Sequence, residues 1–446
     1  MADRSEKKDN HPKIARSSAT DIMSNLPSEV TENILMLLPL RDAVRTSILS
    51  RKWRYKWVNL PQLVFDDTLV KDSMENDDPL LHSKLFKIIF QVLLLHNGPI
   101  VKFTLSISAL KICSEIHPLM VFLSKNGIRE LAIDICDLNG YRFPSSLFSC
   151  EELRQLYLSN CSFDPPLTFK GFSRITSLEF ILVDFGDGVL EKLVSSCPLL
   201  ERLKLEGPMY YDNLEIDAPN LKFLSSNARF KYIHFQNAPL LAVVLITSDD
   251  DEEDGKAYQM IDVFGCLPVI ETLQLGRRFL KFLTVGGVPE RLLFTLDHLK
   301  VLQLDEVYCR EIAEVSFVLC LIKSAPNLKK LEIEMFTSKD DDTGPVLEFL
   351  EMQLYSDVSF NQLREVKMQF YSGTRPELEF IKLILAKSPM LETMLIESSK
   401  EVADNGELTR FPHVAPKVEI IRKDADKNRV TYLAKGLNWS LTEGGG

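Results

Sequence analysis

One short apolar phrase recurs along most of the chain and constrains its fold more than any other feature. The phrase is Leu-x-x-Leu-x-Leu with aliphatic substitutions, first as "IRELAI" from Ile128 and last as "LETMLI" ending at Ile396. The middle positions of its copies lie 20 to 35 residues apart, at Leu131, Leu156, Leu178, Leu203, Leu224, Val244, Leu273, Leu302, Leu331, Val366 and Met394. Alternating apolar residues predict one short strand per copy with an apolar face. No copy buries that face alone, so neighbouring copies should stack into a solenoid.

Two copies match the fuller template of leucine-rich repeats, in which Asn or Cys and then an apolar residue follow the phrase. These residues are Cys161 and Phe163 in "LRQLYLSNCSF", and Cys136 and Leu138 in "IRELAIDICDL". A side chain at the cysteine position points into the coil, so we expect a structural cysteine there. Turns of a small residue and proline, such as "SCP", "DAP" and "SAP", restart an extended segment after each helix or loop. We therefore expect an α/β chain whose repeats form a curved parallel sheet with outer helices and loops.

Three short helical patterns precede the repeats. The first ends at Pro39, the second begins at Asp42 and carries Ile48 on its apolar face, and the third carries Trp53 and Trp57 on one side. Three such helices cannot bury much surface by themselves. Apolar side chains should therefore remain on the outside, where they usually indicate a surface for a partner.

The segment "LPSEVTENILMLLPLRDAVRTSILSRKWRYKW", Leu26 to Trp57, resembles an F-box. The resemblance implies docking to a Skp-family adaptor and, through it, to a cullin-type ubiquitin ligase. Carried over by position, the adaptor-facing or motif-core residues are Leu26, Pro27, Val30, Ile34, Leu38, Val44, Leu49 and Trp53. The sequence does not divide these residues between the two roles, and an ordinary helical cap on the following domain is the alternative interpretation.

The basic and aromatic run "RKWRYKW" also invites a nucleic-acid interpretation. The net charge of −11 argues against a general nucleic-acid binder, which should be basic over its footprint. The longest apolar stretch, Leu85 to Leu95, is interrupted by Lys87 and Gln91 and is too short to span a bilayer. The cysteines form no C-x-x-C pair, so we expect reduced thiols. We therefore expect neither nucleic acid nor a membrane as a partner.

Near the C-terminus, Val358–Glu397 resembles the FBD segment found after F-box and leucine-rich repeats in a large plant group. Its pattern is a strand, a helix opened by Thr374 and Glu377 as a capping box, and a final strand. Together the resemblances identify the chain as a member of the plant F-box/FBD/leucine-rich-repeat family. The expected organisation is a disordered tail at 1–24, an F-box at 25–65, an acidic loop plus linking helix at 66–99, leucine-rich repeats at 100–345, an FBD-like segment at 346–398 and a C-terminal segment at 399–446.

No pattern in the sequence predicts catalysis, a metal or a cofactor. The acidic stretch Asp249 to Ile261 imitates a calcium loop, but Ile261 stands where the loop needs a bidentate Glu. The glycines of "TVGGVPERL" lack the Lys-Ser/Thr of a phosphate loop. The histidines are scattered without an acidic partner at motif spacing. We therefore expect a protein that is not an enzyme and holds no cofactor.

The resemblance implies a substrate-recognition subunit of a Skp–cullin–F-box ubiquitin ligase. The F-box would dock the adaptor, the repeats and the FBD-like segment would bind an unknown target protein, and the contribution to the reaction would be proximity. Two alternatives remain: a leucine-rich-repeat receptor or co-receptor with a deep polar pocket for a small molecule on its concave face, and an adaptor-binding protein that acts outside a cullin complex. We expect the protein in the cytoplasm, the nucleus or both.

Overall fold

The computed structural model describes residues 25–69, 81–108, 110, 115–134, 141–207, 210–247, 263–337, 342–398, 411, 414–415 and 418–424. The chain divides into two units, Met1–Ile100 and Val101–Gly446. We call them the N-terminal unit and the repeat unit. The tail at 1–24, the acidic stretch at 249–261 and most of the C-terminal segment, for which the sequence made predictions, lie outside the described residues, as do Cys136 and Leu138.

The N-terminal unit is built mainly of helices. Its elements are α1 (Ser28–Met36), α2 (Leu40–Arg45), η2 (Thr46–Ile48), η3 (Lys56–Asn59), β1 (Gln62–Asp66), η4 (Asp67–Leu69) and α3 (Leu81–Leu95). Each of the first two helices follows a proline whose carbonyl accepts helical N–H groups, from Thr31 at Pro27 and from Ala43 at Pro39. The linking helix predicted before Asn97 is confirmed as α3.

The prediction of a third short helix that carries both Trp53 and Trp57 is wrong. The chain makes turns from Arg51 to Tyr55 and then enters η3, a 3₁₀ helix. Here each N–H donates to a carbonyl three residues back, as from Lys56 to Trp53 and from Leu60 to Trp57. These tighter turns replace the predicted helix and still place both tryptophans in the core of the unit.

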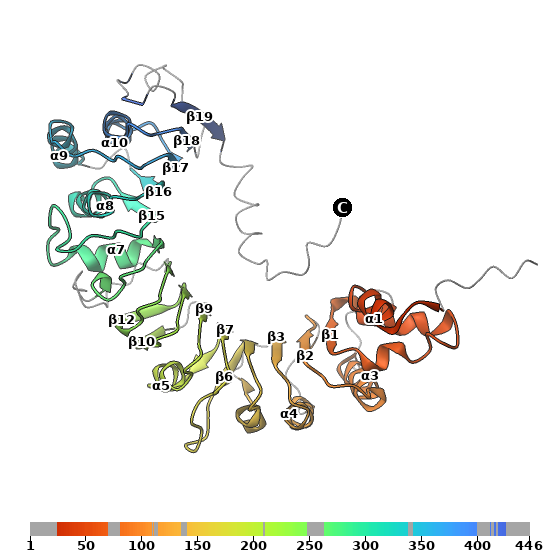
Figure 1. Cartoon of the computed structure of the whole chain (residues 1–446). Coiled ribbons are helices and arrows are strands. Elements are labelled where there is room, and N and C mark those ends of the chain that lie inside the picture. The colour runs from red at the N-terminus through yellow and green to blue at the C-terminus, as the bar shows by residue number, and fades with distance from the viewer. Residues whose placement is uncertain are drawn as a thin grey trace, which may run out of the picture. The chain divides into compact units, whose positions relative to one another are not determined.

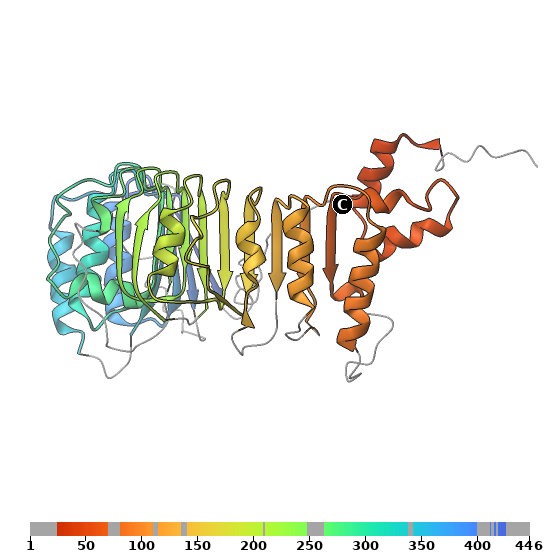
Figure 2. The same cartoon turned by 90° about the horizontal axis from the view of Figure 1, so that it is seen from below.

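The repeat unit has one long parallel sheet as its inner layer. Its strands, in spatial order, are β2 (Lys102–Ser106), β3 (Glu130–Asp134), β5 (Gln155–Ser159), β7 (Ser177–Ile181), β9 (Arg202–Glu206), β11 (Phe223–Ser226), β13 (Val243–Ile246), β14 (Thr272–Leu275), β15 (Val301–Tyr308), β16 (Lys330–Phe336), β17 (Glu365–Tyr371), β18 (Thr393–Ser398) and β19 (Glu419–Asp424). Within this unit the strands line the inside of a curve, and helices cover the outside (Figure 1). Figure 2 shows the strands side by side with the helices in front. The expected solenoid is therefore confirmed.

The register of this sheet confirms every predicted middle position of the repeats. Leu131 pairs with Leu156, and the pairing continues strand by strand to Met394. All of these side chains are buried. The ladder also extends by one strand at each end, through Phe103 in β2 and Ile420 in β19, which the repeat pattern did not predict.

The outer layer changes character along the repeat unit. It contains the helices α4 (Ile116–Lys125), η5 (Ser145–Ser149), α5 (Val189–Ser195), α7 (Arg277–Thr284), α8 (Ile312–Ser324), α9 (Gly344–Leu354) and α10 (Arg375–Lys387). Two small parallel sheets also belong to it, one of β4 (Tyr141–Arg142), β6 (Cys161–Phe163) and β8 (Asp184–Phe185), the other of β10 (Tyr210–Asp217) and β12 (Arg229–Asn237). No helix of the described residues is both long and apolar enough to cross a membrane.

The turns of a small residue and proline recur with one geometry. The carbonyl before the proline accepts the N–H three residues later, as from Leu200 to Cys197 (3.1 Å) and from Leu328 to Ala325 (3.1 Å). The next strand begins directly afterwards. These turns therefore fix where each strand starts, as the sequence predicted.

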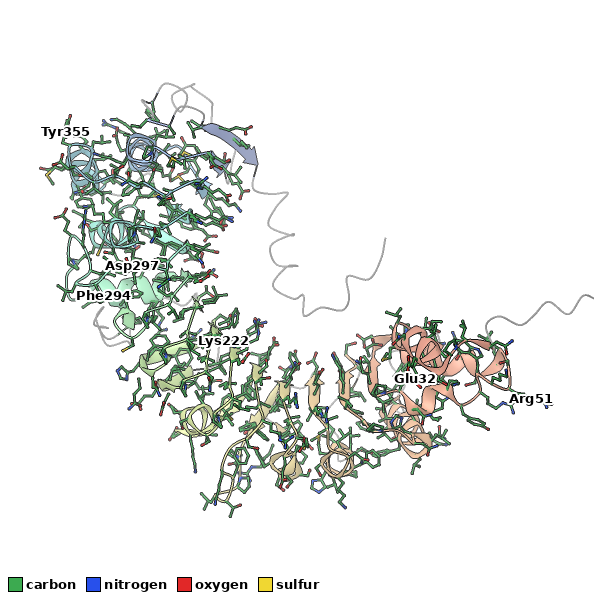
Figure 3. All side chains as sticks on the ribbon, viewed as in Figure 1. Glu32, Arg51, Lys222, Phe294, Asp297 and Tyr355 are labelled. Atoms are coloured by element: carbon green, nitrogen blue, oxygen red, sulfur yellow. The ribbon has the colours of Figure 1, made fainter. Side chains whose placement is uncertain are left out.

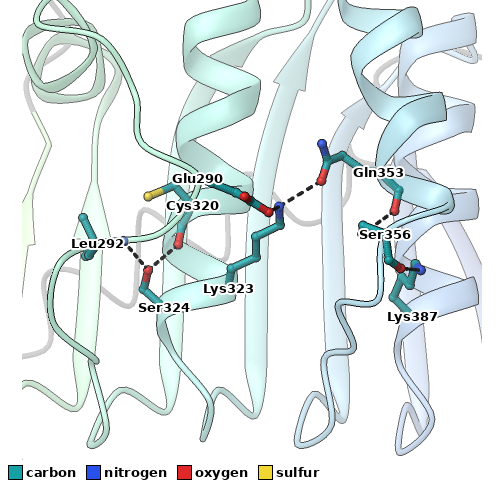
Figure 4. Close-up of polar contacts among 8 residues, drawn as sticks. All are labelled: Glu290, Leu292, Cys320, Lys323, Ser324, Gln353, Ser356 and Lys387. Carbon is teal, nitrogen blue, oxygen red and sulfur yellow. Dashed lines mark hydrogen bonds and ion pairs between the residues drawn. The ribbon is translucent and has the colours of Figure 1, made fainter.

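Polar contacts join the outer helices of successive repeats (Figure 4). Lys323 at the end of α8 donates to Gln353 of α9 (2.8 Å) and pairs with Glu290 (3.2 Å). Ser324 donates to the carbonyl of Cys320 (2.7 Å) and accepts the N–H of Leu292 (2.8 Å). These bonds satisfy loop and helix-end groups that stacking would otherwise bury unpaired.

The segment predicted as FBD-like forms β17, α10 and β18, in the expected order. Glu377 in the first turn of α10 is fully buried. Its carboxylate accepts the N–H groups of Ser372 (3.0 Å) and Thr374 (3.1 Å) and the hydroxyl of Ser372 (2.8 Å). The bond to Thr374 is the glutamate half of the predicted capping box, and it fixes the turn between β17 and α10.

Glu314 in α8 is a buried carboxyl whose stabilising effect depends on pH. It is 5% exposed and accepts the N–H of Tyr308 (2.8 Å). Burial raises the pKa of Glu314 from 4.5 to about 7, against the opposing effects of that hydrogen bond and of Arg277. A raised carboxyl pKa stabilises the fold fully below the ordinary pKa and loses this effect as pH rises through the folded pKa.

We therefore expect this group to lower the free energy of unfolding of the repeat unit by about 3 kcal/mol between pH 4.5 and pH 7. Glu314→Gln keeps an acceptor for Tyr308 and should remove that loss, so that the variant exceeds the wild type in stability at pH 8 and not at pH 4.5. Urea unfolding at both pH values measures the difference. An exposed glutamate of α9 provides the control, as Glu348→Gln. An equal effect of Glu314→Gln at the two pH values would contradict the prediction.

Candidate functional site

The N-terminal unit has a small core that fixes its short helices. Its buried members come from α1, α2, the turns and η3, and they are Leu35, Ala43, Trp53, Trp57, Val58 and Leu60. Four half-buried residues pack against them, namely Leu26, Ile34, Val44 and Val92. Because α3 contributes Val92, the linking helix is part of the same unit as the predicted F-box helices.

Large apolar side chains remain exposed outside this core. Leu37 is 75% exposed, Ile48 86% and Leu49 64%. Together with less exposed neighbours they form what we call the exposed apolar set: Val30, Met36, Leu37, Leu38, Ile48 and Leu49. These residues lie on α1, at its C-terminal end, and around η2. So much exposed apolar area on so small a unit is typical of a surface that a partner covers.

The structure divides the eight residues predicted for the F-box site into two groups. Pro27, Val30, Leu38 and Leu49 are exposed. Leu26, Ile34 and Val44 pack against the core, and Trp53 is buried within it. The first group is accessible to a partner, whereas the second group shapes the unit.

Leu37 and Ile48, the most exposed members of the set, were not among the eight. Leu37 is exposed because α1 ends at Met36, so its side chain leaves the helical stripe. Ile48 was assigned to the apolar face of the second helix, but α2 ends at Arg45 and the chain tightens into η2. In both cases the exposure of the side chain depends on where a helix ends. Local sequence patterns define helix ends poorly.

The two lysines of the run after Ser50 have partners inside the unit. Lys52 donates to Asn25 Oδ1 (2.9 Å), and Lys56 donates to Ser28 Oγ (2.9 Å). Both bonds tie the turns to the start of α1. Arg51 points away from the unit (Figure 3). Both lysines of the run therefore support the fold of the unit, which weakens the nucleic-acid interpretation of this run.

The inner face of the repeat sheet is a second candidate site, because polar side chains alternate there with the buried leucines. Lys204 of β9 lies between Glu179 Oε1 on β7 (2.9 Å) and Glu206 Oε1 on its own strand (2.6 Å). The side chains of Glu179 and Lys204 are 3% and 11% exposed. Burial raises the pKa of Glu179 although Lys204 opposes this effect. This triad is a charged network held inside the concave face.

Neighbouring positions make the same region polar and aromatic. Arg202 lies over the ring of Phe223 on β11, 3.7 Å from its centroid. Burial and the carboxylates of Asp134 and Glu179 raise the pKa of Tyr157 well above its ordinary value. Among the described residues, no group of three or more His, Cys, Asp or Glu side chains is arranged to hold a metal ion. This part of the inner face is therefore charged, polar and partly aromatic.

Comparison with known proteins gives the same division of the chain. Residues 23–64 match the F-box domain model, and residues 118–333 match the model of the leucine-rich repeats of FBD-associated F-box protein At5g56370. The chain is 39% identical over 421 residues to F-box/FBD/LRR-repeat protein At1g13570 of Arabidopsis thaliana, covering 90% of this chain and 98% of that protein. It is 26% identical over 415 residues to the putative FBD-associated F-box protein At5g56390 of the same plant, covering 86% of this chain and 93% of the relative.

Proposed function

Because the chain belongs to the F-box/FBD/LRR-repeat family, we propose that it is the substrate-recognition subunit of a Skp–cullin–F-box ubiquitin ligase. In this proposal the F-box docks a Skp-family adaptor, the adaptor links it to a cullin, and the repeat unit binds the target protein. The protein does no chemistry itself. It holds a target lysine near a ubiquitin-charged enzyme, which raises the effective concentration of the reacting groups.

The observation that carries the proposal is the exposed apolar set on the unit that matches the F-box model. We assign adaptor contact to Val30, Leu37, Leu38, Ile48 and Leu49, because their side chains are accessible. We assign a supporting role to Trp53 and the residues that pack around it, because they are buried. A helical module with apolar side chains at its helix ends suits a helical partner with an apolar groove.

The inner face of the repeat sheet is the surface that we propose for the target protein. It is polar, it extends over successive strands, and its side chains come from consecutive repeats. We also propose that the protein works in the cytoplasm, the nucleus or both. In support, Cys150, Cys161, Cys197 and Cys320 are buried free thiols.

Ubiquitin transfer in a reconstituted ligase tests this proposal. We expect the full chain, mixed with adaptor, cullin, RING subunit and charged conjugating enzyme, to enter the complex and to direct ubiquitin to proteins captured from plant extract. The matched control lacks residues 25–65 and should leave those proteins unmodified, because its repeat unit is disconnected from the cullin. Binding of the full chain to the adaptor without recruitment of the cullin would contradict the ligase proposal and would favour an adaptor-binding protein outside a cullin complex.

A further inference from the structure

The exposed apolar set of the N-terminal unit borders a stretch of chain whose charged residues are all positive. No Asp or Glu occurs between Asp42 and Asp66. The basic residues of this stretch are Arg45, Arg51, Lys52, Arg54 and Lys56. The whole chain, by contrast, has a net charge of −11. The stretch therefore produces a local field whose sign is opposite to that of the net charge.

The turns from Arg51 to Tyr55 divide this run into a buried side and an exposed side. Trp53 lies in the core of the unit, whereas Arg51, Arg54 and Tyr55 are exposed. Tyr55 is 66% exposed, and Arg51 points away from the unit (Figure 3). Because Trp53 anchors the turns, their outer side presents two guanidinium groups and a phenol to solvent. We call Arg51, Arg54 and Tyr55 the positive border.

A hydrogen bond joins the positive border to the exposed apolar set. Ser47 Oγ donates to the carbonyl oxygen of Arg54 (2.8 Å). Ser47 belongs to η2 and comes directly before Ile48 and Leu49, which are 86% and 64% exposed. The bond therefore holds the turn of Arg54 against the segment that carries the exposed apolar side chains. Positive and apolar side chains lie side by side on one surface of the unit.

Ion pairs with described residues neutralise little of the positive charge in this stretch. Lys52 and Lys56 donate to neutral side chains, so each keeps its full charge. Arg45 pairs with Asp42 at 3.5 Å, but the two side chains are 59% and 50% exposed. Water screens a pair in such a setting. The charge beside the exposed apolar set is therefore available to a partner.

We propose that the positive border meets carboxylates of the adaptor at the rim of the apolar groove that receives Ile48 and Leu49, and that it speeds the encounter. This inference rests on the adaptor-docking function proposed above. Interfaces commonly have an apolar centre and a polar rim, and arginine and tyrosine are enriched in them. Charges at a rim act mainly on the association rate and on its salt dependence. A phosphate backbone would leave Ile48 and Leu49 uncovered, so an acidic protein surface fits better than nucleic acid.

Association kinetics of the full chain with immobilised adaptor test the positive border. Between 100 mM and 1 M NaCl the screening length falls from about 10 Å to about 3 Å, so the association rate of the wild type should fall roughly tenfold. Arg51→Glu combined with Arg54→Glu should lower the association rate at 100 mM NaCl by at least roughly tenfold and remove most of its salt dependence. The dissociation rate should change by less than roughly threefold, because the apolar contacts remain. Surface plasmon resonance measures both rates.

Two further variants separate charge at this position from other effects. Arg51→Lys combined with Arg54→Lys keeps both charges and should keep the association rate and its salt dependence. The matched control reverses two exposed charges of the repeat unit, as Lys170→Glu with Arg291→Glu, and changes the net charge by the same amount. It should associate like the wild type. The substituted side chains are all exposed, so every variant should keep the melting temperature of the wild type.

The outcomes distinguish this inference from the docking proposal on which it rests. An association rate that is independent of salt, or that the double glutamate variant of Arg51 and Arg54 leaves unchanged, would overturn the inference alone. An equal loss in the matched control would also overturn it, because only the net charge would then matter. Tight binding of a single-stranded oligouridine RNA, lost in the double glutamate variant while adaptor association persists, would assign the positive border to nucleic acid instead. No adaptor binding by the wild type would overturn both proposals.

Discussion

Replacing Ile48 and Leu49 together by aspartate should abolish adaptor binding while the N-terminal unit stays folded. Both side chains are already in water, 86% and 64% exposed, so a charge there costs the free protein little. In the complex the adaptor would cover two carboxylates without partners. Leaving one charge buried and unpaired at an interface costs about 2–5 kcal/mol, so the pair should weaken binding by at least roughly a thousandfold. Surface plasmon resonance with immobilised adaptor measures the loss.

Two further variants separate lost contact from lost fold. Leu167→Asp makes the same chemical change at a leucine of the repeat unit that is 96% exposed, and it should bind the adaptor as the wild type does. Trp53→Ala should also lose binding, but by a different route. It removes a buried indole from the core and should cost about 3–5 kcal/mol of folding free energy. If the Ile48 and Leu49 variant bound with wild-type affinity, the exposed apolar set would not be the docking surface.

The repeat register could be predicted because it rests on a strict local rule. Side chains alternate along a strand. A shift of the strand register by one residue would therefore move Leu203 and Leu205 from the core to the inner face. The phrase Leu-x-x-Leu-x-Leu states this alternation directly, and every predicted middle position lies in one ladder. The end strands β2 and β19 have the same alternation, but the full phrase is missing around Phe103 and Ile420, so counting repeats did not find them.

The outer layer was less predictable because several local structures can cover the same face. Between β9 and β13 it consists of the strands β10 and β12, and from α7 onward it consists largely of helices. Packing against the neighbouring repeats decides whether an outer segment forms a strand or a helix. The sequence of one segment does not show which of the two will form. Arg278, in the first turn of α7, is only 6% exposed. A buried arginine cannot be recognised from a pattern of exposed and apolar positions, because arginine usually indicates the surface.

For the F-box site, the sequence predicted a set of residues but did not say which contact the adaptor and which form the core of the module. The resemblance named eight residues as adaptor-facing or motif-core, but their accessibility depends on where each helix ends. Leu35 is fully buried and Leu37 is mostly exposed, two positions apart on the chain. A difference of this kind follows from the end of α1 at Met36 and from the packing of Trp53, which a sequence pattern does not fix.

The second large effect that we expect is a loss of folding stability when Lys204, on the inner face of the repeat sheet, is replaced. Lys204→Met should lower the free energy of unfolding of the repeat unit by about 3–5 kcal/mol, because it leaves the buried carboxylate of Glu179 without its partner. Burial alone would lower the pKa of Lys204, but hydrogen bonds to Glu206 and Glu179 outweigh it and raise that pKa. The lysine is therefore held charged in the wild type. Urea unfolding at pH 8 measures the loss.

The pH dependence and a double variant identify the cause of that loss. In Lys204→Met the pKa of Glu179 should rise further, so the variant should regain stability as pH falls and Glu179 takes up a proton. Adding Glu179→Leu should restore most of the stability at pH 8, since the remaining carboxylate, Glu206, is 29% exposed and stays hydrated.

The matched control for Lys204 is Lys222, labelled in Figure 3, which pairs with Glu201 at the same 2.9 Å in an exposed setting. Its side chain is 54% exposed, so Lys222→Met should cost at most about 1 kcal/mol. A similar loss for the two lysines would mean that burial does not set the strength of the inner network. A larger loss at Lys204 would mean that burial sets the strength of this network, which makes this part of the inner face a rigid charged surface.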